Sequence, residues 1–265
     1  MLGAVLSNKL ADRLSDVQPV HWTTPAVLAL VVWVIYTLDR LLDIRKPGVT
    51  VTPRHQFHRE QAPYLWQGVI GAAALAGLLA FWLPASVLRF GAVLGLLCAL
   101  YVAGVYRLPA DHPAQWLKEP LVALLFAAGV WGSIWVQRPA VTGVFVAEGV
   151  MFTAIAFQNL LLFSVMEKRE TPQLAPASLA QRWGEVTCDR VLRWLTFGVV
   201  ATALGICFLN DGVGASPRFA QRAALMLGIM SITLYVIQRY PAYFLRHERY
   251  RWLGDAVFWL PALVL

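Results

Sequence analysis

The chain has 265 residues, of which 58% are hydrophobic and only 14% are charged, and its formal net charge is +7. An ordinary soluble domain carries about 25% charged residues and avoids large apolar surface patches. The composition therefore argues against a soluble enzyme, a disordered protein and a nucleic-acid-binding arm, and no nucleic-acid partner is expected. In a membrane chain, the position of the basic residues is more informative than their sum.

Eight hydrophobic segments follow one another along the chain, at about 24–42, 64–83, 86–106, 117–137, 141–166, 190–209, 220–239 and 252–265. A helix that crosses a bilayer needs about 20 mostly apolar residues. The segments lack the alternation of apolar and polar residues that strands show, which argues against a β-barrel. We therefore predict an all-α, polytopic transmembrane helical bundle of about eight spans, which forms a single domain over residues 1–265.

Residues 1–20 have a different pattern, in which apolar residues alternate with charged ones at roughly helical spacing. One interpretation is an amphipathic helix that lies in the membrane interface. The other is the remnant of a truncated first span. The sequence leaves both open.

The basic residues are distributed unequally between the two ends of the predicted spans. If the spans alternate in direction, 16 of the 22 Lys and Arg residues fall at one end, together with the two longest polar connections, 43–62 and 167–189. Cytoplasmic loops carry an excess of Lys and Arg. We therefore expect this basic end to face the cytoplasm.

An acidic pair closes the first span at this end. Asp39 and Asp43 are four residues apart, so they share one face of a helix and repel each other. The C-terminal end of a helix also disfavours anions. One interpretation is an interfacial salt-bridge cluster with Arg40 and Arg45. The other is a magnesium site completed by phosphate oxygens of a substrate.

A second acidic pair, Glu167 and Glu170, closes a span four crossings later and therefore lies at the same end. Their spacing again places them on one helix face, and Asn159 precedes them in the same span. Two matched pairs beside basic loops favour a shared site for a cation and a polyphosphate. The alternative is that residues 167–170 form a solvated helix end of mixed charge.

Basic residues that could bind a diphosphate lie in the connections at this end, since arginine side chains bind phosphate in a bidentate manner. Attraction to anionic lipid headgroups is the alternative explanation, and His55 and His58 lack a third ligand at a spacing typical of zinc. A lysine before a span commonly extends toward the interface instead of binding a ligand. The candidates for diphosphate binding are Arg40, Arg45, Lys46, Arg54, Arg59 and Lys118.

These motifs resemble those of the UbiA-type intramembrane prenyltransferase superfamily. The segment Asp39-Arg40-Leu41-Leu42-Asp43 resembles the end of that family's first aspartate motif, and Ile35 and Tyr36 stand where the family has Asn and Asp. The stretch from Asn159 through Glu167 and Glu170 to the segment 178–184 resembles its second motif. If the first of the family's nine helices is missing or reduced to residues 1–20, the two motifs fall on helices two and six.

The resemblance implies a divergent member that transfers an isoprenyl group from a prenyl diphosphate to a lipophilic acceptor, with Mg²⁺ as cofactor. It implies that Asp39, Asp43, Glu167 and Glu170 hold the metal, that Asp39, Asp43 and Glu167 are the catalytic residues, and that Asn159 and Tyr36 contact the substrate. The expected location is the inner (plasma) membrane of a bacterium, among membrane lipids.

Two other functions are alternatives to this one. The first is a non-catalytic protein of the same fold that binds a lipid or acts as an assembly partner. The second, a transporter, ranks last because the span centres offer little that is polar beyond Asn159. The acceptor, the prenyl chain length and the oligomeric state do not follow from the sequence.

Overall fold

The computed structural model describes residues 1–15, 21–44, 53–108, 112–138, 142–170, 178–209 and 217–265. Nearly all of these residues lie in helices and none lies in a strand. Among these residues, seven helices are long and apolar enough to cross a membrane. The predicted all-α polytopic bundle is therefore confirmed. The length and composition of these helices are those of an integral membrane protein.

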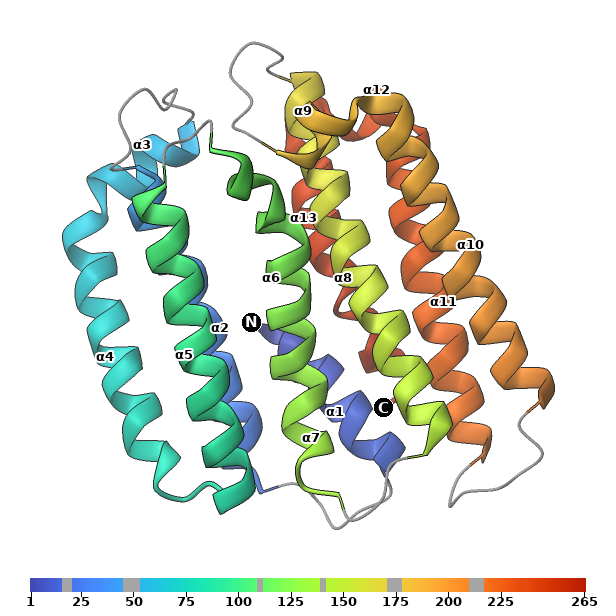
Figure 1. Cartoon of the computed structure of the whole chain (residues 1–265), viewed down its shortest axis with the longest axis horizontal. Helices are drawn as coiled ribbons and strands as arrows, with labels where there is room; N and C mark the ends of the chain where they lie inside the picture. Colours follow the sequence, from blue (N-terminus) through green and yellow to red (C-terminus); the bar gives the residue numbers. More distant parts are fainter. Residues whose placement is uncertain (16–20, 45–52, 109–111, 139–141, 171–177, 210–216) are drawn as a thin grey trace.

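The spanning helices run roughly parallel or antiparallel to one another in Figure 1, where α2 lies behind α5. They are α2 (Thr23–Asp43), α4 (Ala62–Ala80), α5 (Ala85–Arg107), the span that contains α6 (Lys118–Ala127), α8 (Gly143–Glu170), α10 (Glu185–Leu209) and α11 (Pro217–Arg239). Helix α4 packs mainly on α2, whereas α10 and α11 pack on each other and on α8. In the figure α6 lies between the pair α2 and α5 on one side and α8 on the other.

Helix α8 is the most buried of the spans. Its buried residues cover more than half of its circumference, whereas Val146 and Val150 on the remaining face are exposed. An aromatic cluster holds the N-terminal half of α8 in place. The ring of Trp131 stacks on that of Phe152 with 5.2 Å between the ring centroids, and the Phe152 ring contacts that of Phe258 edge-to-face at 5.8 Å. The core of the bundle therefore centres on α8.

The span of α6 is not a regular α-helix. It begins with a short 3-10 turn, Pro113–Leu117, and ends with a π-helical turn, Ala128–Gly132, and the short helix α7 (Ser133–Trp135). The side chain of Asn8 donates to the carbonyl of Val130 at 2.7 Å and to Ser133 Oγ at 3.0 Å. A π-helical turn displaces backbone groups from the regular α-helical pattern, and a side chain from another helix binds one of these carbonyls.

Residues 1–20 contribute α1 (Leu2–Ser15), which packs into the bundle. Leu10 and Ala11 are fully buried, and the side chain of Arg13 donates a hydrogen bond to the carbonyl of Leu265. Its apolar face is therefore buried against protein, and α1 is not among the seven helices that could span a membrane.

The last predicted segment, 252–265, is not a span of its own in the described part of the chain. Helix α13 runs from Arg249 to Val257 and a 3-10 turn, Leu260–Leu263, follows. A proline at position 261 removes a backbone donor and disfavours continuation of the helix. The difference from about eight expected spans therefore comes from this short, interrupted helix.

Candidate functional site

The first acidic motif lies at the C-terminal end of α2. Asp39 Oδ1 is 3.5 Å from Lys118 Nζ, and Lys118 is the first residue of α6. The guanidinium of Arg40 lies over the ring of Tyr36 at 5.3 Å. Asp39 and its lysine therefore connect two spans, and Tyr36 is half-exposed beside them.

The second acidic motif lies at the C-terminal end of α8 and contacts α13. Glu167 Oε1 is 2.9 Å from Arg251 Nη1, and the hydroxyl of Tyr250 donates to Glu170 Oε2 at 3.1 Å. Arg251 Nε is also 2.8 Å from Glu248 Oε2. Both acids of the pair thus have partners on the same short helix.

The electrostatics of this contact follow from burial and from the neighbouring acids. Burial raises the pKa of Tyr250, because the charged form would lose its hydration. Burial alone would lower the pKa of Arg251, but the nearby Glu167, Tyr250 and Glu248 outweigh it, so that the pKa is raised. Both groups therefore keep their protons at neutral pH: Tyr250 as a donor and Arg251 as a cation.

Asn159 lies two turns before Glu167 on α8 and is buried. A Cβ atom at Gly254 would lie 2.7 Å from Asn159 Oδ1 and 2.5 Å from Phe163 Cε1, so α13 approaches α8 closely here. Asn159 Oδ1 is buried without a hydrogen-bond partner. The predicted substrate-binding residue therefore faces the contact between α8 and α13.

The N-terminus of α6 contacts both motif regions. Lys118 pairs with Asp39 of α2, and Glu119 Oε1 accepts a hydrogen bond from the backbone N–H of Leu179 at 3.1 Å. Leu179 begins α9 (Leu179–Trp183), the short helix that follows the second acidic motif. The end of α2 and the segment after α8 are therefore held at one end of the bundle by two consecutive residues.

Helix α9 has a defined beginning and end. The side chain of Ser178 caps its N-terminus by accepting from the backbone N–H of Gln181, and Gly184 ends it with φ 75°. That backbone conformation favours glycine. The segment 178–184, which the sequence analysis singles out, thus forms one capped helical turn at the basic end.

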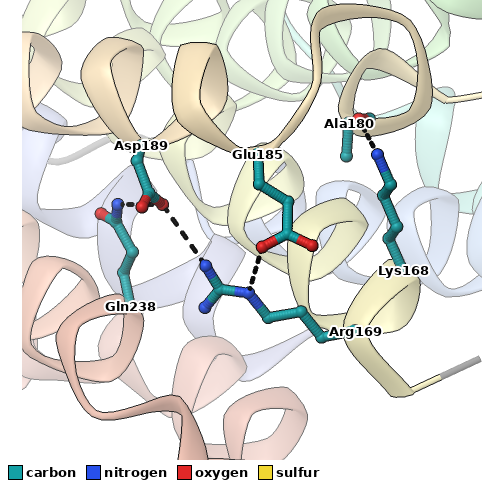
Figure 2. A network of polar contacts seen from close by, with 6 residues as sticks. All are labelled: Lys168, Arg169, Ala180, Glu185, Asp189 and Gln238. Atoms are coloured by element: carbon teal, nitrogen blue, oxygen red, sulfur yellow. Dashed lines mark hydrogen bonds and ion pairs between the residues drawn. The ribbon is translucent and has the colours of Figure 1, made fainter. Parts of the chain in front are cut away.

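A further polar network at this end joins α8, α10 and α11 (Figure 2). Arg169 Nε donates to Glu185 Oε2 at 3.0 Å, and its Nη2 lies 3.7 Å from Asp189 Oδ1. Asp189 in turn accepts from Gln238 Nε2 at 2.8 Å. In the sequence Arg169 is one of the basic residues at the end of a span, and the spacing of Glu185 and Asp189 on one helix face is the signal that points to a partner for it.

Lys168, the neighbour of Arg169, binds backbone instead of an acid. Its Nζ donates to the carbonyl of Ala180 at 3.0 Å, as Figure 2 shows. A cation near helix-end carbonyls is favourable. Lys168 therefore helps to hold α9 against the end of α8.

Several predicted residues fall in or beside the connection after α2. Arg45 and Lys46 lie outside the described residues, and the side chains of Asp43 and Arg54 are likewise not described. Arg59 lies in the short helix α3 (Pro53–Glu60) and is exposed. The contribution of this connection to a diphosphate site therefore remains a prediction.

The predicted magnesium ligands are not assembled as one group in the described part of the chain. No set of three or more His, Cys, Asp or Glu residues is close enough there to hold a metal ion. Asp39 pairs with Lys118, whereas Glu167 and Glu170 pair with residues of α13. The two acidic motifs thus share one end of the bundle, and each has a partner from the protein.

Comparison with known proteins identified no relative. Neither family models, nor curated proteins, nor solved structures gave a match.

Proposed function

We propose that this chain is an integral membrane enzyme of the prenyltransferase type, which transfers an isoprenyl group from a prenyl diphosphate to a lipophilic, aromatic acceptor. The observation that carries the proposal is the contact of α6 with both motif regions through Lys118 and Glu119. It brings acidic and basic side chains of α2, α6 and the α8–α9 region to one end of an apolar bundle. A prenyl diphosphate has the matching shape, an anionic head on an apolar tail.

In this reaction the allylic C–O bond breaks and the diphosphate leaves with the electron pair. The acceptor then attacks the allylic cation and loses a proton. Lys118, which lies at a helix N-terminus, stabilises the negative charge that develops on the leaving group. The surrounding apolar helices exclude water, which would otherwise consume the cation.

Magnesium enters this proposal as a prediction of the resemblance. The described residues do not form a three-acid site, and Asp43, the second acid of the predicted first pair, has a side chain that the structure does not describe. No step is therefore assigned to the metal, and the dependence on Mg²⁺ is an outcome of the experiment. The orientation with the basic end in the cytoplasm of a bacterium is likewise part of the proposal.

The test is equilibrium binding of a non-hydrolysable prenyl thiodiphosphate to the full chain in lipid nanodiscs, with and without Mg²⁺. Replacement of Lys118 by Gln removes one charge-assisted contact and is expected to weaken binding about tenfold or more. Arg89→Gln is the matched control, because Arg89 is an exposed cation near the start of α5, away from the motifs. Absence of binding to the unmodified chain, or equal effects of both variants, would refute the proposal.

The second candidate is a non-catalytic membrane protein that binds a lipid or acts as an assembly partner. The observation in its favour is that Asp39, Glu167 and Glu170 each have a partner within the protein. It predicts that the chain binds a prenyl diphosphate or another anionic lipid without turnover. Release of diphosphate in the presence of an aromatic acceptor distinguishes the two candidates.

A further inference from the structure

Helix α13 packs against the face of α8 that carries the second acidic pair. Tyr250 is fully buried, its ring meets Phe163 edge-to-face at 5.9 Å, and its hydroxyl binds Glu170. One turn further, Gly254 lies so close to Phe163 that a Cβ atom would clash. Helix α13 is therefore fixed against α8 at two levels, and Arg251 lies between them.

The backbone before α13 has a conformation that non-glycine residues rarely adopt. His247 and Glu248 have φ values of 55° and 52°. Such residues cost of order 1 kcal/mol each and persist where the surrounding structure holds them. Here the unfavourable conformation places Glu248 Oε2 2.8 Å from Arg251 Nε.

Arg251 therefore bridges two acids, one on its own segment and one on α8. The contact with Glu167 compensates an unfavourable arrangement of charges. Glu167 and Glu170 are like charges on one helix face, at the C-terminal end of the helix, where the helix dipole disfavours anions. A cation beside these acids stabilises the helix end. The chain supplies it at 2.9 Å from Glu167.

We propose that Arg251 is the resident cation of the second acidic motif and takes, at Glu167, the place where the resemblance expects a divalent metal ion. A divalent cation in this chain would then depend on the acids of α2 and not on Glu167. The inference rests on the proposed function only in taking a divalent metal ion as the ligand. The pairing of Arg251 with Glu167 does not depend on the proposed function.

The chemistry supports mutual exclusion of the two cations. A guanidinium in contact with a carboxylate oxygen repels a second positive charge at the same carboxylate. Magnesium also requires near-octahedral coordination at about 2.0–2.1 Å, and Glu170 already accepts a hydrogen bond from Tyr250. Binding of a metal at Glu167 would require Arg251 to leave.

The experiment measures Mn²⁺ binding by electron paramagnetic resonance to the full chain in nanodiscs, with manganese alone as the probe. We expect Glu167→Gln to change the Mn²⁺ affinity by less than twofold. Arg251→Gln is expected to create additional Mn²⁺ binding, which the double variant loses again. Arg249→Gln is the matched control, because the Arg249 guanidinium lies over the Tyr243 ring at 4.5 Å on the same segment.

A severalfold loss of Mn²⁺ affinity in Glu167→Gln would overturn the inference, as would the absence of additional binding in a folded Arg251→Gln variant. Arg251→Lys keeps the charge and is expected to bind Mn²⁺ like the unmodified chain, which controls for loss of folding. Since no prenyl diphosphate is used, failure of the proposed function leaves this test intact.

Discussion

A hydrogen-bonded cluster in the middle of the bundle gives the sharpest prediction of stability. Gln158 of α8 is fully buried and donates to Thr196 Oγ1 of α10 at 2.9 Å and to the carbonyl of Ser231 of α11 at 3.1 Å. It also accepts from Ser231 Oγ at 2.6 Å. One amide side chain therefore connects three spans.

Replacement of Gln158 by Leu removes all three contacts and keeps a similar side-chain volume. Hydrogen bonds between transmembrane helices contribute about 0.6 kcal/mol each on average, so three give about 2 kcal/mol. Thr196 keeps its bond to the carbonyl of Leu192, which lowers the cost of leaving it without the amide. We expect Gln158→Leu to destabilise the bundle by about 1–2 kcal/mol.

The assay is reversible unfolding in mixed micelles with increasing SDS, followed by circular dichroism. Thr233→Val is the control, because the Thr233 hydroxyl is exposed and donates to the carbonyl of Ile229 in its own helix, and little change is expected. A Gln158→Leu variant as stable as the unmodified chain would show that the cluster does not hold the three helices together. The double variant Gln158→Leu/Ser231→Ala gives a second check. Because the two residues bond to each other, its loss of unfolding free energy is expected to be smaller than the sum of the two single losses, and a loss equal to that sum would contradict the reasoning.

Two further predictions concern the contact between α8 and α13. Gly254→Ala places a methyl group against Phe163 and is expected to destabilise the bundle by about 1–3 kcal/mol, whereas Gly205→Ala, which meets open space, is expected to be neutral in the same unfolding assay. The raised pKa of Tyr250 means that its stabilising contribution is complete below about pH 10, the value of an exposed tyrosine, and is lost as the pH rises further. Alkaline titration of unfolding is therefore expected to show a steeper loss above pH 10 in the unmodified chain than in Tyr250→Phe, and identical profiles would contradict this.

The spans could be predicted from the sequence because hydropathy over about 20 residues is a property of the segment alone. Thr23–Leu42 and Arg218–Arg239, for example, agree closely with the predicted 24–42 and 220–239. The burial of α1 could not be predicted in this way. An amphipathic helix has the same pattern whether its apolar face contacts lipid or protein, and the π-helical turn that Asn8 binds has no signature of its own.

The acidic motifs show the same limit. Their location at one end of the bundle follows from counting spans, and the like-charge spacing of Glu167 and Glu170 indicates a nearby positive charge. The identity of that charge depends on how α13 packs. Arg251 lies 84 positions after Glu167 in the chain, and no local pattern connects the two.

The position of α1 has a consequence for the order of folding. Its Asn8 binds Val130 and Ser133, which lie 122 and 125 positions later, and its Gly3 lies against Phe258. Contacts between such distant residues form only after the intervening chain has been made and inserted. We therefore expect α1, although it precedes these residues in the chain, to complete its contacts late, and the bundle to form through a state in which α1 does not yet pack on the π-helical turn and on the helices after it.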